Sequence, residues 1–199
     1  KGRSVVIAGS MGPTSESYNP DAVPPYEDCL SAYRAQSRVL ADEGVDLILV
    51  ETCTTVSEAR AGVAAAIEAG MPVWAALVVD ANGRVKGGGT VARALKTLTE
   101  ASASAFLINC TQAPLVALAL EELSNQRKVP IGVYAQGAIY GGSGWDFEPS
   151  MSPKQYLEYA KVWVALGARV IGGCCGTTPE HIRALKMGLP HRIENGSSD

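Results

Sequence analysis

The chain has 199 residues, of which 47% are hydrophobic, and it carries a formal net charge of −3. This length is sufficient for one domain with a hydrophobic core, and the negative charge gives no reason to expect a nucleic acid or an anionic membrane as a partner. No uninterrupted apolar run reaches about 18 residues, which argues against a transmembrane helix. Five cysteines without the spacing of a disulfide framework indicate a reducing compartment, so we expect a cytoplasmic protein.

Short β-branched segments alternate with longer helical stretches along the chain, which is the pattern of βα units around a parallel sheet. The predicted strands are apolar at successive positions, as expected of strands covered on both faces; they comprise residues 4–8, 47–51, 73–79, 105–110, 131–135 and 169–173. The predicted helices comprise residues 25–43, 56–69, 91–101, 113–125, 153–166 and 179–186. An open doubly wound sheet fits this number of units, although no Gly-x-Gly-x-x-Gly motif follows a strand.

Three cysteines lie at the carboxyl ends of two predicted strands. Cys110 ends the strand 105–110, and Cys174 and Cys175 follow the last strand between glycines. Adjacent cysteines rarely pair with each other, and the flanking glycines allow the sharp turn that aims two sulfur atoms at one point. Converging thiolates suit a tetrahedral Zn²⁺ with its fourth position open to water or substrate. Buried cysteines that act as small hydrophobic residues are the alternative, but a doublet between glycines favours the metal site.

These residues belong to motifs that resemble the zinc-dependent homocysteine S-methyltransferase family. The segment Gly-Gly-Cys-Cys-Gly-Thr-Thr-Pro-Glu-His-Ile at 172–182, the pair Asn109-Cys110 and the segment Ala-Gly-Ser-Met-Gly-Pro at 8–13 carry the resemblance. It implies an α/β fold of the eight-stranded TIM-barrel type, in which this chain begins at the third strand. We therefore expect a barrel truncated to about six βα units over residues 1–188, followed by a polar, disordered tail at 189–199.

The resemblance also implies a reaction. Cys110, Cys174 and Cys175 would hold Zn²⁺ and activate the thiol of homocysteine, which takes a methyl group from a donor such as S-methylmethionine or betaine and becomes methionine. The alternative is a catalytically incomplete homologue or fragment that binds metal or a partner without turnover, because the family places a glycine-rich substrate loop in the absent first strands. Six units also leave two strand edges unpaired, so we expect a homo-oligomer that covers them.

Substrate contacts are expected from three further residues. Glu51 ends a run of four apolar residues, where an unpaired carboxylate is costly to bury; the resemblance assigns it to the α-amino group of homocysteine, and a structural bond to a backbone amide or an arginine is the alternative. Asn109 and Ser10 are expected to line the same rim, and both also fit roles in their turns.

Three other features have weaker links to chemistry. The segment Lys-Gly-Gly-Gly-Thr at 86–90 resembles a phosphate cradle, but it lacks the ending of a P-loop, so a flexible connection with Thr90 as a helix cap is favoured. The glycine-rich loop with Tyr140 and Trp145 is a candidate lid for an onium donor, with an ordinary long loop as the alternative. His181 is expected to be a surface or capping residue.

Overall fold

Parallel strands pair in the same order in which they occur in the chain. The computed structural model describes residues 5–123, 128–138 and 151–190, and within these ranges it contains one six-stranded sheet of order β1-β2-β3-β4-β5-β6. The strands are β1 (Ala8–Met11), β2 (Leu47–Cys53), β3 (Val73–Leu77), β4 (Ala105–Gln112), β5 (Ile131–Gln136) and β6 (Val170–Ile171). A doubly wound sheet reverses its strand order at a switch point. The consecutive order therefore confirms the barrel-type fold, here with six βα units, and contradicts the doubly wound alternative.

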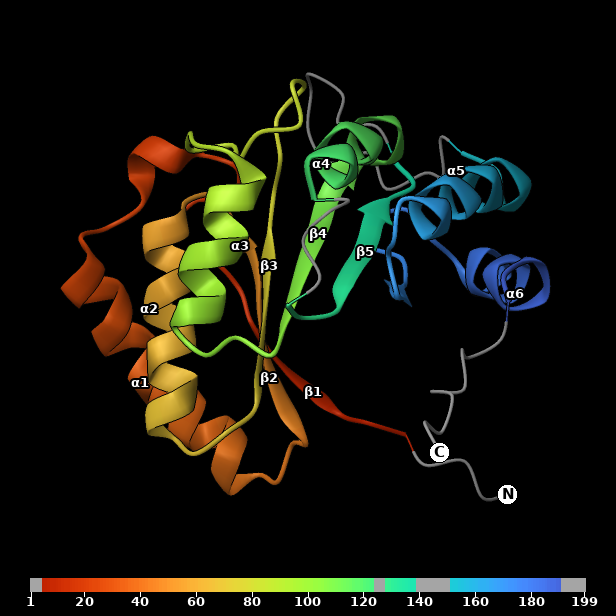
Figure 1. The fold of residues 1–199 in the computed structure, drawn as a ribbon. Coiled ribbons are helices and arrows are strands. Elements are labelled where there is room, and N and C mark those ends of the chain that lie inside the picture. Colours follow the sequence, from red (N-terminus) through yellow and green to blue (C-terminus); the bar gives the residue numbers. More distant parts are fainter. Residues whose placement is uncertain (1–4, 124–127, 139–150, 191–199) are drawn as a thin grey trace, which may run out of the picture.

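Helices follow the strands and surround the outer side of the curved sheet (Figure 1). They are α1 (Tyr26–Asp42), α2 (Val56–Glu68), α3 (Val91–Glu100), α4 (Val116–Leu123), α5 (Pro153–Ala165) and α6 (Pro179–Gly188), with short 3₁₀ turns η1 (Pro20–Ala22) and η2 (Ala113–Leu115). Each helix packs against the next one along the chain. Right-handed crossovers that always step in one direction place every helix on the same face, which leaves the other face of the sheet on the inside.

The polar residues at the helix starts explain where several helices begin. The side chain of Thr55 accepts the Glu58 amide at the start of α2, and Ser152 forms a capping box with Gln155 at the start of α5. Such caps satisfy amide groups that have no partner within the helix. At the other end, Gly167 takes a φ of 105° just after α5, a conformation that glycine adopts without strain.

Two hydrophobic clusters lie on the two faces of the sheet. The larger one fills the space between the sheet and the helices and includes Phe106, Tyr156 and Trp163. The smaller one lies on the inner face, where Ala76, Ala105 and Leu107 are buried and are packed by half-buried Leu49, Trp74, Tyr134 and Val170. Because strand side chains alternate between faces, the residues that continue this inner row toward the carboxyl ends of the strands point into the same concave space.

The first strand begins later than its sequence predicts. β1 starts at Ala8, which pairs with Leu47, whereas Val5 is 74% and Ile7 60% exposed. The predicted strand 4–8 is therefore wrong in its limits, because the extent of an edge strand depends on the register of its single neighbour and apolar sequence does not encode that register. β6 is likewise short and, in the described ranges, pairs with β5 alone.

Some predictions fall outside the described residues. These are the loop with Tyr140 and Trp145 and the tail from residue 191 onward. In the part of the chain that the structure describes, no helix is both long and apolar enough to cross a membrane.

Candidate metal and substrate site

Three thiols converge at the carboxyl ends of the strands. Cys110 lies in β4 and is 7% exposed, whereas Cys174 and Cys175 follow β6 and are partly exposed. The three Sγ atoms all lie within 4.8 Å of one another, and those of Cys174 and Cys175 are 3.8 Å apart. The structure thus brings together the three cysteines that the sequence analysis selected, and within the described residues no other group of three potential metal ligands is this close.

Backbone contacts with the end of β5 bend the cysteine doublet toward β4. The amide of Cys174 donates to the carbonyl of Ala135 over 3.0 Å, and the amide of Gly137 donates to the carbonyl of Cys175 over 2.8 Å. Gly176 then takes a φ of 73°, and a β-carbon there would lie only 2.4 Å from that of a neighbouring alanine. Glycine at this position is therefore required both by the backbone conformation and by the close approach of the chain.

Strand irregularities orient the residues at the ends of β2 and β4. Thr52 and Cys110 have φ values of 63° and 46°, and the pairing register shifts around both positions. Such bulges redirect the side chains that they carry. Asn109, which directly precedes Cys110, has no exposed surface. Its Oδ1 accepts the Thr52 amide at 3.1 Å and its Nδ2 donates to Thr52 Oγ1 at 2.8 Å, so that both ends of the carboxamide are bound to one residue.

Two hydroxyl groups from other strands bind the carboxylate of Glu51 on the concave inner face. Ser10 in β1 donates its hydroxyl to Glu51 Oε1 over 2.5 Å, and Tyr134 in β5 donates to Oε2 over 2.8 Å. Glu51 is only half-buried. Among the described residues, its two hydrogen-bond partners are hydroxyl groups, not the backbone amide or arginine of the structural alternative. The partly open carboxylate lies on the same rim as the thiols. Ser10 reaches this rim as expected, where it contacts Glu51.

The electrostatics of the thiol cluster favour one thiolate beside a protonated neighbour. A hydrogen bond from Cys174 is the main reason that the pKa of Cys110 falls to about 6, with hydrogen bonds from Tyr18 and Thr52 adding to it against the opposing effect of burial. The same hydrogen bond to Cys110, together with burial, raises the pKa of Cys174. Burial, followed by the charge of Glu51, raises the pKa of Tyr134. Tyr134 is therefore neutral and can act as the donor to that carboxylate.

Tyr18, Thr52 and Tyr134 were not anticipated from the sequence. Thr52 directly follows Glu51. This position would have indicated a role for Thr52 only if a bulge at the end of the strand had been predicted as well. Tyr134 lies in the predicted strand 131–135, but an apolar strand does not show which of its side chains face inward. Tyr18 lies in the loop after β1 with a φ of 66°, and no motif marks it.

The remaining cysteines and His181 have other surroundings. Cys29 and Cys53 are buried, with Cys53 Sγ 3.8 Å from the hydroxyl of Tyr33. His181 is 1% exposed, so the expectation of a surface position is wrong and that of a capping residue is confirmed. Its Nδ1 accepts the Thr178 amide at 3.1 Å, and its Nε2 lies 2.9 Å from the carbonyl of Met151, an arrangement that suits a proton on Nε2.

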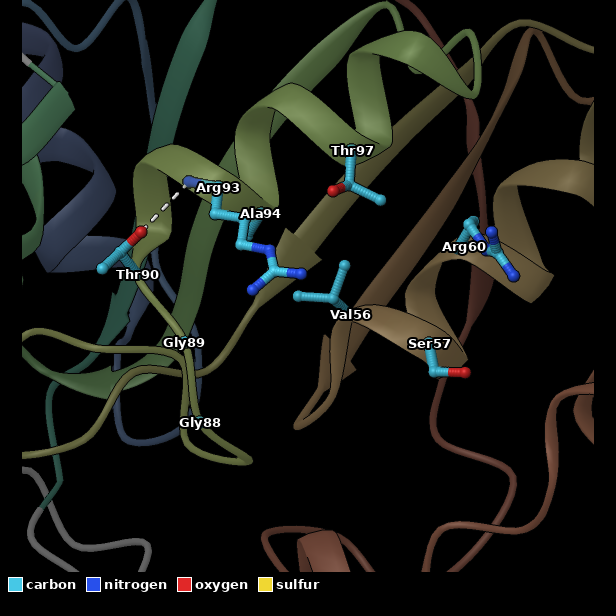
Figure 2. A pocket seen from close by; sticks show the side chains of 9 residues that line it. All are labelled: Val56, Ser57, Arg60, Gly88, Gly89, Thr90, Arg93, Ala94 and Thr97. Atoms are coloured by element: carbon cyan, nitrogen blue, oxygen red, sulfur yellow. Dashed lines mark hydrogen bonds between the residues drawn. The ribbon is translucent and has the colours of Figure 1, made fainter.

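A surface pocket lies between the first turns of α2 and α3, and no cysteine is among the residues that line it (Figure 2). Its walls are formed by Val56, Ser57, Arg60, Gly88, Gly89, Thr90, Arg93, Ala94 and Thr97. The hydroxyl of Thr90 accepts the Arg93 amide at 3.2 Å and caps α3, as predicted. Gly88 and Gly89 have φ values of 99° and 92°, which glycine adopts without strain, and a β-carbon at Gly87 would lie 2.7 Å from the carbonyl oxygen of Thr54.

Comparison with known proteins identifies the family to which the chain is similar. The sequence profile of the homocysteine S-methyltransferase family matches residues 1–189. The chain is 28% identical over 193 residues to a methionine synthase of Mycobacterium leprae and 29% identical over 197 residues to that of Mycobacterium tuberculosis. These alignments cover 92% and 94% of this chain, but only 16% of each methionine synthase.

A solved structure shows the same relationship in three dimensions. The homocysteine methyltransferase MmuM of Escherichia coli, in its metallated form, superposes with a TM-score of 0.76 at 28% identity. The match covers 92% of this chain and 61% of MmuM, so this chain spans less than two thirds of that protein. Because the family profile matches almost the whole chain, the protein described here belongs to the homocysteine S-methyltransferase family.

Proposed function

We propose that the protein transfers a methyl group to the thiol of homocysteine, with Zn²⁺ held by Cys110, Cys174 and Cys175. The convergence of these three Sγ atoms within 4.8 Å is the observation that carries the proposal. Membership of the family supports it, as does the metallated form of the similar protein MmuM. Because a thiolate site requires reduced cysteines and the cytosol keeps thiols reduced, a cytoplasmic location is part of the proposal.

The three thiols fit a zinc ion in chemistry and in spacing. A tetrahedral zinc with Zn–S bonds of about 2.3 Å separates its sulfur ligands by about 3.8 Å, and the Sγ atoms of Cys174 and Cys175 are 3.8 Å apart. Thiolates are also soft ligands, which select zinc over magnesium or calcium. When bound, the zinc ion would accept the homocysteine sulfur as its fourth ligand and keep it deprotonated near neutral pH.

The chain's own residues would bind and orient the amino acid. Glu51 presents a partly open carboxylate to the α-ammonium group, and the hydroxyls of Ser10 and Tyr134 hold its two oxygens. The expected substrate contact of Asn109 would be indirect, through Thr52. Transfer forms a bond from the homocysteine sulfur to the methyl carbon while the bond from that carbon to the donor breaks. The electron pair of the broken bond leaves with the donor heteroatom, which suits an onium donor such as S-methylmethionine or betaine.

The test combines metal analysis with a methionine-forming assay on the reduced chain. We expect one zinc ion per chain, and Cys110→Ser or Cys174→Ser should remove it, whereas Cys29→Ser, which alters a buried cysteine outside the cluster, should retain it. Full zinc occupancy in either cluster variant would refute the metal assignment. A chain that binds zinc and homocysteine but forms no methionine with either donor would refute turnover and support the incomplete homologue.

A further inference from the structure

A buried side-chain contact connects the ends of two strands that are not neighbours. Asn109 in β4 binds Thr52 in β2 through both ends of its carboxamide, whereas β3 lies between these strands in the sheet. Asn109 is fully buried, and a buried amide that loses its partners is strongly disfavoured. The contact therefore constrains β2 and β4 relative to each other at the concave rim, in addition to the backbone pairing of each strand with β3.

The backbone at both ends of this contact is held in an unusual conformation. Thr52 and Cys110 take left-handed φ values of 63° and 46°. Residues other than glycine keep such conformations only where their surroundings impose them. Asn109 provides that constraint for Thr52, because its Oδ1 accepts the amide of the strained residue itself. It also precedes Cys110 directly, so that the same buried carboxamide anchors the start of the bulge that carries the thiol.

The contact has a residue of the proposed site on each side. Glu51 directly precedes Thr52, and Cys110 directly follows Asn109. A bound homocysteine would have to reach from the carboxylate to the metal with its ammonium group and its sulfur, which a short carbon chain separates. The distance between Glu51 and Cys110 must therefore be held constant, although the two residues belong to different strands.

We propose that Thr52 and Asn109 form a positioning pair that sets Cys110 in register with Glu51, an inference that rests on the proposed function. The pair touches neither the transferred methyl group nor, by itself, the metal. Its role is to couple the direction of the Cys110 thiol to the location of the Glu51 carboxylate. The alternative is that the contact contributes only to folding stability, and the two roles differ in what a substitution changes.

The test uses two substitutions that spare the backbone. Thr52→Gly removes the hydroxyl but keeps the amide bonded to Asn109, and glycine suits a φ of 63°. Asn109→Asp retains the side-chain shape but replaces the amide donor with an acceptor. Thr52→Ser preserves the hydroxyl. Thr99→Val is a matched control, because the Thr99 hydroxyl bonds to the Leu95 carbonyl in α3, away from the cysteines.

Two readouts separate positioning from stability. Titration of the reduced, metal-free protein with Co²⁺ gives a thiolate-to-cobalt charge-transfer band that reports the arrangement of the thiol ligands. Calorimetry of the zinc-loaded protein gives the Kd of homocysteine. We expect Asn109→Asp to change the cobalt band and to weaken homocysteine binding about tenfold, the effect of losing one hydrogen bond. Thr52→Gly should do at least as much, because it also loses the hydrogen bond from Thr52 to Cys110. Thr52→Ser and Thr99→Val should leave both readouts unchanged.

A double variant provides the decisive comparison. If the two residues act as one unit, the combined Thr52→Gly, Asn109→Asp variant should bind homocysteine about as weakly as the weaker-binding single variant. Additive losses in the double variant would overturn the inference, as would an unchanged cobalt band and Kd in variants that only melt at a lower temperature. If the parent protein binds Co²⁺ but no homocysteine, the proposed function fails, while an unaltered cobalt band in the variants would still refute the positioning pair.

Discussion

Removal of the Tyr134 hydroxyl tests whether Glu51 is held in place for a substrate. Tyr134→Phe preserves the ring on the inner face but deletes the 2.8 Å hydrogen bond to Glu51 Oε2, while the bond from Ser10 to Oε1 remains. A hydrogen bond to a charged group contributes about 1.5 to 3 kcal/mol. Glu51 is half-buried, so water can replace part of the lost bond. The lower figure is therefore appropriate, and it corresponds to about a tenfold weaker Kd for homocysteine.

The assay is calorimetric binding of homocysteine to the zinc-loaded protein, with zinc content and melting temperature measured in parallel. Glu51→Gln removes the negative charge and should weaken binding more than Tyr134→Phe does, with zinc content and melting temperature nearly unchanged. In the Glu51→Gln background, Tyr134→Phe should have a smaller effect, because the hydroxyl then no longer bonds to a charge. Tyr159→Phe is the control, since Tyr159 packs against the larger hydrophobic cluster, between the sheet and the helices.

Two outcomes would refute this reasoning. If Tyr134→Phe binds homocysteine as the parent does while Glu51→Gln does not bind it, the tyrosine does not orient the carboxylate. If Glu51→Gln lowers the melting temperature strongly and leaves the affinity unaltered, Glu51 has a structural role and the assignment of the ammonium contact is wrong.

Two further predictions concern the cysteine loop and the strand edges. Gly176→Ala should lower the free energy of unfolding by more than about 1 kcal/mol and weaken zinc binding, because the new β-carbon combines a φ of 73° with a 2.4 Å approach to Ala138. Urea unfolding measures this loss, with Gly12→Ala as the control because its β-carbon would meet nothing within 4 Å. Equal stability of the two variants would contradict the prediction. Val5 and Ile7 are exposed beside the edge strand β1, which predicts self-association of the protein. Sedimentation velocity at micromolar concentration should therefore show species heavier than 20.8 kDa. A well-behaved monomer would contradict this expectation.

Local features of the sequence predicted the βα units and the thiol cluster, whereas the barrel type of the fold was implied by the family resemblance. Apolar strands alternating with capped helices predicted βα units, and the carboxyl ends of parallel strands meet at one rim. Cys110 and the doublet at 174–175 each end or follow a strand, so the fold class alone implied that they would meet. The glycines around the doublet were also readable, because a turn as sharp as the one at Gly176 excludes a side chain.

Contacts across the inner face depended on the tertiary structure. The bond from Tyr134 to Glu51 joins β5 to β2, and the bond from Asn109 to Thr52 joins β4 to β2. Both require the curvature of the sheet, and both depend on which side chains face inward. Strands that are apolar on both faces do not show that alternation in their sequence. The left-handed conformations at Thr52 and Cys110 likewise arise from pairing with neighbouring strands, since neither residue type favours them by itself.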